Sequence, residues 1–79
     1  MNKLMEMRTS AGLSRPQLSK LSGLNLRSIE AYEQGKCDVN GAKIKTVLRL
    51  SEALGCRMRD ILDDEELIRL LDEDALKYK

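Results

Sequence analysis

Four glycines divide this chain into short segments of helical character. Gly12, Gly23, Gly35 and Gly55 each follow a stretch whose apolar residues recur three or four positions apart, which is the spacing of one helix face. A glycine just past such a stretch is a common helix C-terminal residue, because it adopts a positive φ without steric cost. No segment alternates apolar and polar residues over the length that a strand requires. The glycine spacing therefore predicts an all-α fold of short helices.

Polar residues mark where these helices are expected to begin. Ser14 is followed three positions later by Gln17, the pattern of a capping box, and Asn25 precedes the next apolar stripe. The predicted helices span residues 2–11, 15–22, 26–34, 42–54 and 64–78, with a loop over 36–41 and a short helical turn over 57–62. The side chains expected to face inward are Leu4, Met7, Ala11, Leu18, Leu21, Ile29, Tyr32, Ile44, Val47, Leu48, Leu50, Leu54, Ile61 and Leu62.

Composition excludes several classes of function. Seventy-nine residues are enough for one small domain, and no histidine is present to serve as a general base or metal ligand. Two cysteines cannot form a four-ligand zinc site, and no nucleophile–base pair is evident, so we expect neither an enzyme, a metal site nor a cofactor. No apolar run approaches the roughly 20 residues of a membrane span. We expect a cytoplasmic protein with Cys37 and Cys56 as free thiols.

Charge is distributed unevenly along the chain. Residues 1–62 contain eleven Lys/Arg against six Asp/Glu, a net charge of +5, and residues 63–79 contain three against seven, a net charge of −4. A basic body is compatible with binding a polyanion, although +5 alone is weak support. This shift in composition predicts a domain over 1–62 followed by an acidic amphipathic helix over 63–79.

Two short helices meeting at Gly23 are the most informative local feature. Such a unit matches a helix-turn-helix, whose second helix lies in the major groove of DNA. Together with its neighbours, the unit resembles the Cro/CI-type (XRE-family) helix-turn-helix domain over about residues 4–62. The matching segments are Gly12-Leu13-Ser14, Gln17-Leu18-Ser19, Leu21-Ser22-Gly23-Leu24 with Ile29, Tyr32-Glu33-Gln34-Gly35 and Ala53-Leu54-Gly55-Cys56.

The resemblance implies a five-helix, lambda-repressor-like domain of a bacterial transcription regulator, with double-stranded DNA as its partner. It places Arg15 where the family often has a glutamine that touches a phosphate, and it pairs Arg8 with Glu33 in a structural ion pair. Arg27 has the chemistry to bind guanine O6 and N7 together, and Lys36 to bind a phosphate. The residues expected to face DNA are Arg15, Gln17, Asn25, Leu26, Arg27, Ser28, Glu30, Ala31, Gln34 and Lys36.

Two of these residues, Glu30 and Leu26, leave open an alternative to sequence-specific DNA binding. Glu30 accepts from cytosine N4 but repels phosphate elsewhere, and Leu26 either touches a thymine methyl or marks a lost base contact. The alternative is a protein-interaction or antitoxin-like module on a helix-turn-helix scaffold.

The acidic helix at the end of the chain has three interpretations. It packs on its own domain, pairs with a second copy, or binds a different protein. A homodimer is favoured, because two half-sites multiply a weak affinity for DNA. Its predicted seam consists of Leu67, Ile68 and Leu71.

Overall fold

The computed structural model describes residues 2–78, and in that range the chain forms five α-helices and two single 3-10 turns and no strand. The predicted all-α class is therefore confirmed. The helices are α1 (Lys3–Ser10), α2 (Arg15–Ser22), α3 (Leu26–Glu33), α4 (Ile44–Leu54) and α5 (Glu65–Lys77), and the 3-10 turns are η1 (Val39–Gly41) and η2 (Met58–Ile61).

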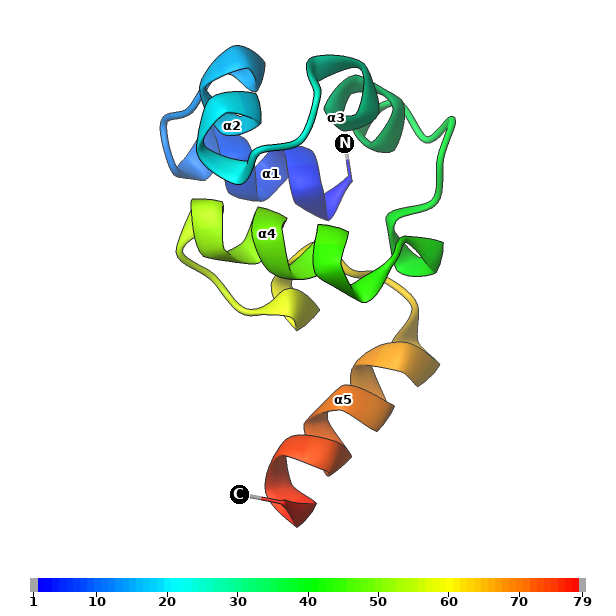
Figure 1. The fold of residues 1–79 in the computed structure, drawn as a ribbon. Coiled ribbons are helices and arrows are strands. Elements are labelled where there is room, and N and C mark those ends of the chain that lie inside the picture. Colours follow the sequence, from blue (N-terminus) through cyan, green and yellow to red (C-terminus); the bar gives the residue numbers. More distant parts are fainter. Residues whose placement is uncertain (1, 79) are drawn as a thin grey trace.

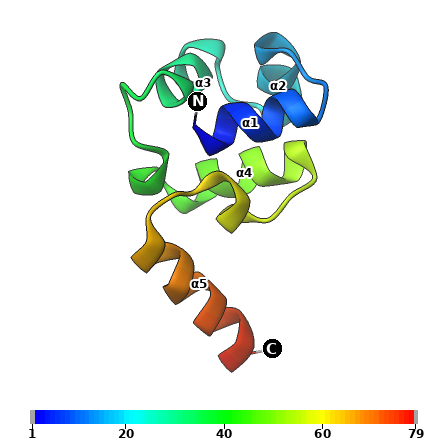
Figure 2. The same ribbon diagram turned by 180° about the vertical axis from the view of Figure 1, so that it is seen from behind.

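Helices α1 to α4 form the body, and α5 leaves it at the end opposite α2 and α3 (Figures 1 and 2). Helix α2 packs against both α3 and α4, and η2 packs against α1 and α4. This arrangement presents α2 and α3 together at one end of the molecule. The acidic α5 lies far from them at the other end.

Local sequence explains where the helices begin. The Ser14 hydroxyl accepts a hydrogen bond from the Gln17 amide at 3.2 Å, and the Gln17 side chain accepts one from the Ser14 amide at 2.8 Å. This is the predicted capping box, which satisfies two amides that a helix start leaves unpaired. Asn2 and Asp64 cap α1 and α5 in the simpler way, with one side-chain oxygen each.

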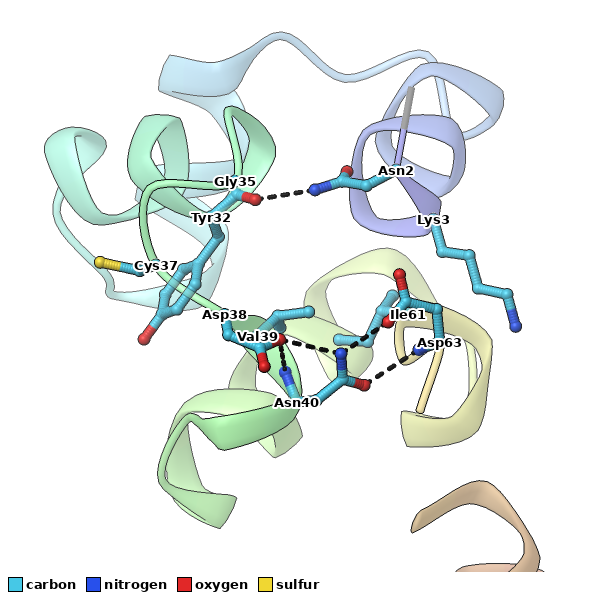
Figure 3. Close-up of a pocket in the computed structure, with 10 residues that line it drawn as sticks. All are labelled: Asn2, Lys3, Tyr32, Gly35, Cys37, Asp38, Val39, Asn40, Ile61 and Asp63. Carbon is cyan, nitrogen blue, oxygen red and sulfur yellow. Dashed lines mark hydrogen bonds between the residues drawn. The ribbon is translucent and has the colours of Figure 1, made fainter. Parts of the chain in front are cut away.

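Asn40 fixes the point at which α5 leaves the body (Figure 3). Its side-chain nitrogen donates to the carboxylates of Asp38 and Asp63, and its side-chain oxygen accepts from the backbone amides of Asp63 and Asp64 at 3.0 Å. One amide side chain thus ties the loop after α3 to the residues before α5. The short loop at 36–41 therefore holds the start of α5 against the body.

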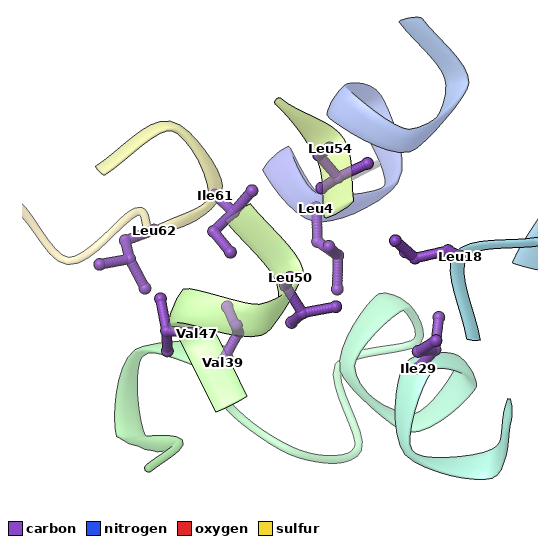
Figure 4. Close-up of a cluster of buried hydrophobic side chains, with 9 residues drawn as sticks. All are labelled: Leu4, Leu18, Ile29, Val39, Val47, Leu50, Leu54, Ile61 and Leu62. Carbon is purple, nitrogen blue, oxygen red and sulfur yellow. The ribbon is translucent and has the colours of Figure 1, made fainter. Parts of the chain in front are cut away.

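Nine apolar residues form one buried cluster, drawn in Figure 4. Leu4, Leu18, Ile29 and Leu50 have no exposed surface, so α1 to α4 each contribute at least one fully buried side chain. Burying a leucine or isoleucine stabilises a fold by about 1.5–3 kcal/mol, and this cluster is the main favourable contribution to folding. The remaining members are Val39, Val47, Leu54, Ile61 and Leu62.

Four side chains predicted to face inward do not. Ala11, the residue directly after α1, is exposed, and the other three lie within helices. Leu21 is 62% exposed, Ile44 63% and Leu48 41%. All three lie at the edge of a helical stripe whose centre is buried, so the spacing was right and the width of the buried face was overestimated. Helix α4 also begins at Ile44 rather than residue 42, and the predicted loop contains η1, whose Val39 is buried.

Candidate nucleic-acid interface

The turn between α2 and α3 is closed by a left-handed glycine and two short-range hydrogen bonds. Gly23 has φ 76°, a left-handed conformation that costs other residues energy. The Ser19 hydroxyl donates to the Leu24 carbonyl oxygen at 2.5 Å, and the Ser22 hydroxyl accepts from the Leu24 amide at 3.2 Å. Leu24 itself is half-buried against the core. These contacts set the angle at which α3 leaves α2.

Helix α3 begins at an exposed edge. The Asn25 side-chain oxygen accepts from the Ser28 amide at 2.8 Å, which confirms the predicted cap. Leu26, the first residue of the helix, is 38% exposed although it is apolar. The start of α3 therefore presents amide groups, one amide side chain and one apolar side chain to solvent.

The outer face of α3 carries a shallow hollow of about 340 Å³. It contains two cationic side chains, Arg27 and Lys36, and one carboxylate, Glu30. The opposite face of α3 holds Ile29, which is fully buried. The hollow is lined by five of the residues predicted to face DNA: Arg27, Glu30, Ala31, Gln34 and Lys36.

Glu33, at the end of α3, is the centre of a buried ion cluster that we call the Arg8–Glu33–Arg15 triad. The Arg8 guanidinium donates to both carboxylate oxygens, at 2.6 and 3.1 Å, and to the Leu13 carbonyl at 2.9 Å. Arg15 donates through Nε to the same carboxylate at 2.9 Å. The structure therefore contains the expected Arg8–Glu33 pair and adds Arg15, which was expected to face DNA and not this carboxylate.

The triad determines the charge state of Glu33. Burial alone would raise the pKa of this carboxyl, but hydrogen bonds from Arg8 and Arg15 and their positive charges hold the pKa below its ordinary value. The same contact raises the pKa of Arg8, chiefly through its hydrogen bond to Glu33. Glu33 is therefore a carboxylate at neutral pH, and the triad carries a net charge of +1.

A second cavity of about 210 Å³ lies beneath the loop after α3 (Figure 3). Its polar side chains are largely occupied by structural contacts, since Asn2 donates to the Tyr32 carbonyl at 2.7 Å and Asn40 is bonded as described above. No group of three or more metal-ligating side chains occurs in the described part of the chain. This cavity belongs to the scaffold.

The two cysteines differ in environment. Cys37 is exposed, and Cys56 is half-buried beside the core. Burial, with a smaller contribution from Asp60, raises the pKa of the Cys56 thiol and makes it less reactive. Both are free thiols, as expected. Among residues 2–78, no helix has the length and apolar character that crossing a membrane would need.

The sequence matches the Cro/C1-type HTH DNA-binding domain family over residues 3–66, most of the chain. The protein therefore belongs to this family, which is a DNA-binding family and not a family of enzymes. Comparison with curated proteins and with solved structures gave no match. Family membership agrees with the architecture, in which α2, the turn and α3 form the helix-turn-helix unit.

Proposed function

We propose that this protein is a transcription regulator that reads a specific duplex DNA sequence with α3 and represses by covering a promoter in the cytoplasm. The observation that carries the proposal is the hollow on α3, where Arg27, Glu30 and Gln34 surround a surface beside Lys36. Side chains that reach base edges confer specificity, whereas contacts to phosphate set position.

Each residue of the face receives a role from its chemistry. Arg27 binds guanine O6 and N7 together, and Gln34 and Ser28 offer polar groups near the same groove. Leu26 contacts a thymine methyl, and Glu30 accepts from cytosine N4. Phosphates are contacted by Arg15 and Gln17 in the first turn of α2, by Asn25 at the start of α3 and by Lys36 in the loop after α3. Ala31 leaves room for the groove to approach.

The test is a selection of bound sequences from random duplex DNA at about 0.1 M salt. Wild type is compared with Arg27→Ala and with Arg49→Ala, an exposed arginine on α4 that removes the same charge away from the proposed face. We expect wild type and Arg49→Ala to enrich the same site, and Arg27→Ala to relax one position of it. Enrichment of no sequence by wild type would refute specific recognition.

We also propose that the regulator acts as a homodimer on an inverted repeat. The predicted seam residues Leu67, Ile68 and Leu71 are half-buried against the chain's own core, so only part of their surface is free. The same helix continues past the body and exposes Leu70, Leu76 and Tyr78 at 48%, 79% and 73%. Tyr78, the C-terminal cap of α5, continues the stripe of Leu67 and Leu71 and extends the seam that we propose, whereas Leu70 and Leu76 lie on other faces of the helix.

The size of this surface limits how tightly two copies associate. A stable interface buries about 800 Å² on each partner, and the outer eight residues of α5 form a helix only about 12 Å long. We therefore expect weak pairing in solution that becomes effective when two half-sites hold the copies together. Sedimentation at high micromolar concentration should show a dimer that Tyr78→Asp abolishes and Leu21→Asp, at an exposed leucine on α2, preserves. A monomer at all concentrations would contradict the dimer.

A protein-interaction or antitoxin-like module is the second candidate. Two observations favour it: Glu30 places a negative charge on the outer face of α3, and the end of α5 exposes apolar residues. This candidate requires a partner protein for α5 and no sequence preference on DNA. The selection described above separates the two, because only the regulator enriches a site that depends on Arg27.

A further inference from the structure

Glu33 is a buried carboxylate, and the free-energy cost of removing its charge from water must be compensated by its neighbours. Its side chain has no exposed surface, and it is the only acidic residue in the buried set of the described chain. A carboxylate in such a place is strongly destabilising unless cations and hydrogen bonds compensate it. Arg8 alone already supplies two hydrogen bonds, one to each oxygen. The contact with Arg15 is therefore more than the burial of Glu33 requires.

The two arginines are used in different ways. The Arg8 side chain is only 13% exposed, and its guanidinium donates hydrogen bonds to Glu33 and to the Leu13 carbonyl. Arg15 is 29% exposed and bonds Glu33 through Nε. No hydrogen bond to a described residue engages its two terminal nitrogens, and neither is among the buried unpaired atoms of residues 2–78. Arg15 thus keeps two donors open to solvent.

Arg15 is also the first residue of α2, directly after the Ser14 cap. Helix N-termini favour anions, and a guanidinium matches phosphate geometry with two parallel hydrogen bonds. A free arginine side chain loses rotamer entropy when it binds a phosphate. An arginine that is already held at Nε has lost part of that freedom before the phosphate arrives.

We infer that Glu33 is a positioning residue for DNA binding, which fixes Arg15 so that its terminal nitrogens meet a backbone phosphate at the start of α2. The inference rests on the proposed binding of duplex DNA. Because two guanidinium groups outweigh the one carboxylate, the triad has a net charge of +1 and attracts a phosphate overall. Glu33 thereby links the packing of α1 and α3 to a contact made by α2.

The test is a double-mutant cycle on a random-sequence duplex, since phosphate contacts do not depend on sequence. Wild type, Arg15→Ala, Glu33→Gln and the double variant are titrated between 50 and 200 mM salt. We expect each single variant to bind about 3- to 10-fold more weakly and Arg15→Ala to lower the slope of log affinity against log salt by about one unit. Glu33→Gln should have no further effect once Arg15 is absent.

Two further variants distinguish a loss of DNA affinity caused by destabilisation of the fold from one caused by a displaced Arg15 side chain. Arg8→Leu destabilises the triad but leaves the Arg15–Glu33 contact in place, so its DNA affinity, measured well below its melting temperature, should stay within twofold of wild type. Arg15→Lys keeps the charge but has no Nε contact with Glu33, and it should lose affinity despite an unchanged salt slope. This variant also serves if Glu33→Gln fails to fold.

The outcomes distinguish the inference from the proposal on which it rests. If wild type binds no duplex, the DNA-binding proposal fails and the positioning role with it. If wild type binds but Glu33→Gln weakens binding equally with and without Arg15, Glu33 does not act through Arg15. Wild-type affinity in Arg15→Lys overturns the inference as well.

Discussion

The hydroxyl of Ser19 donates a 2.5 Å hydrogen bond to the carbonyl oxygen of Leu24, across the turn that joins α2 to α3. Both residues are half-buried, so Ser19→Ala would leave that carbonyl unpaired in a site with little access to water. We expect a loss of about 1–2 kcal/mol in the free energy of unfolding, or a decrease in Tm of several degrees. Thermal melting checks this, with the exposed Ser10→Ala expected to change Tm little.

Gly23 provides a second test of the same turn. Its φ of 76° is costly for a residue with a Cβ, yet an added Cβ would meet no atom within 4 Å. We therefore expect Gly23→Ala to cost about 1–2 kcal/mol through conformation alone, and Gly23→Asn to cost less. Gly41→Ala is the matched control, because Gly41 is equally open but does not have a positive φ. Equal losses at both glycines would contradict this explanation.

The triad predicts how stability depends on pH. The pKa of Glu33 is lower in the folded state than in the unfolded chain, so its contribution is fully present above the ordinary glutamate pKa of about 4.3. That contribution is lost as pH falls through the lower folded pKa. Denaturant unfolding should show no loss from Glu33 between pH 5 and 8 and a decline in more acidic solution.

The acid limb of that profile can be assigned to Glu33 by substitution. Glu33→Gln removes the titrating group, so the difference in unfolding free energy between wild type and variant should shrink as pH falls below about 4. A difference that stays constant down to pH 2 would show that the carboxylate charge is not what stabilises the triad.

Glu33→Ala should be the most damaging single change in the helix-turn-helix. It leaves two arginines facing a site without an anion, and losing one partner of a buried ion pair costs about 3–5 kcal/mol. A chain of this length is stable by only about 4–12 kcal/mol. Chemical denaturation at 10 °C should show a largely destabilised protein, whereas the same change at Glu52, an exposed acid on α4, should cost under 0.5 kcal/mol.

Features set by neighbouring residues were predictable from the sequence. The capping box at Ser14, the cap at Asn25 and the helix ends at Gly23 and Gly55 depend on residues a few positions apart, and all four are confirmed. The burial of Leu18 and Ile29 followed from helical spacing in the same way.

Features set by packing between distant segments were not predictable. The exposure of Leu21 depends on where α4 crosses α2, which no local pattern encodes. The contact of Arg15 with Glu33 joins residues 18 positions apart and depends on the angle between α2 and α3. The one available signal was chemical: a glutamate predicted to be buried beside one arginine, with a second arginine at the start of the preceding helix.

The measurement that tests the central claim most directly is a titration of the isotope-labelled protein with duplex DNA, followed by backbone amide NMR. A chain of 79 residues suits this experiment, and each amide reports on its own position. We predict that the largest chemical-shift changes fall at residues 14–17 and 25–36, and that α5 beyond Leu71 shows only the smaller changes expected where two copies pair on adjacent half-sites. No change at low salt, or changes concentrated in α4 and α5, would contradict binding through α2 and α3.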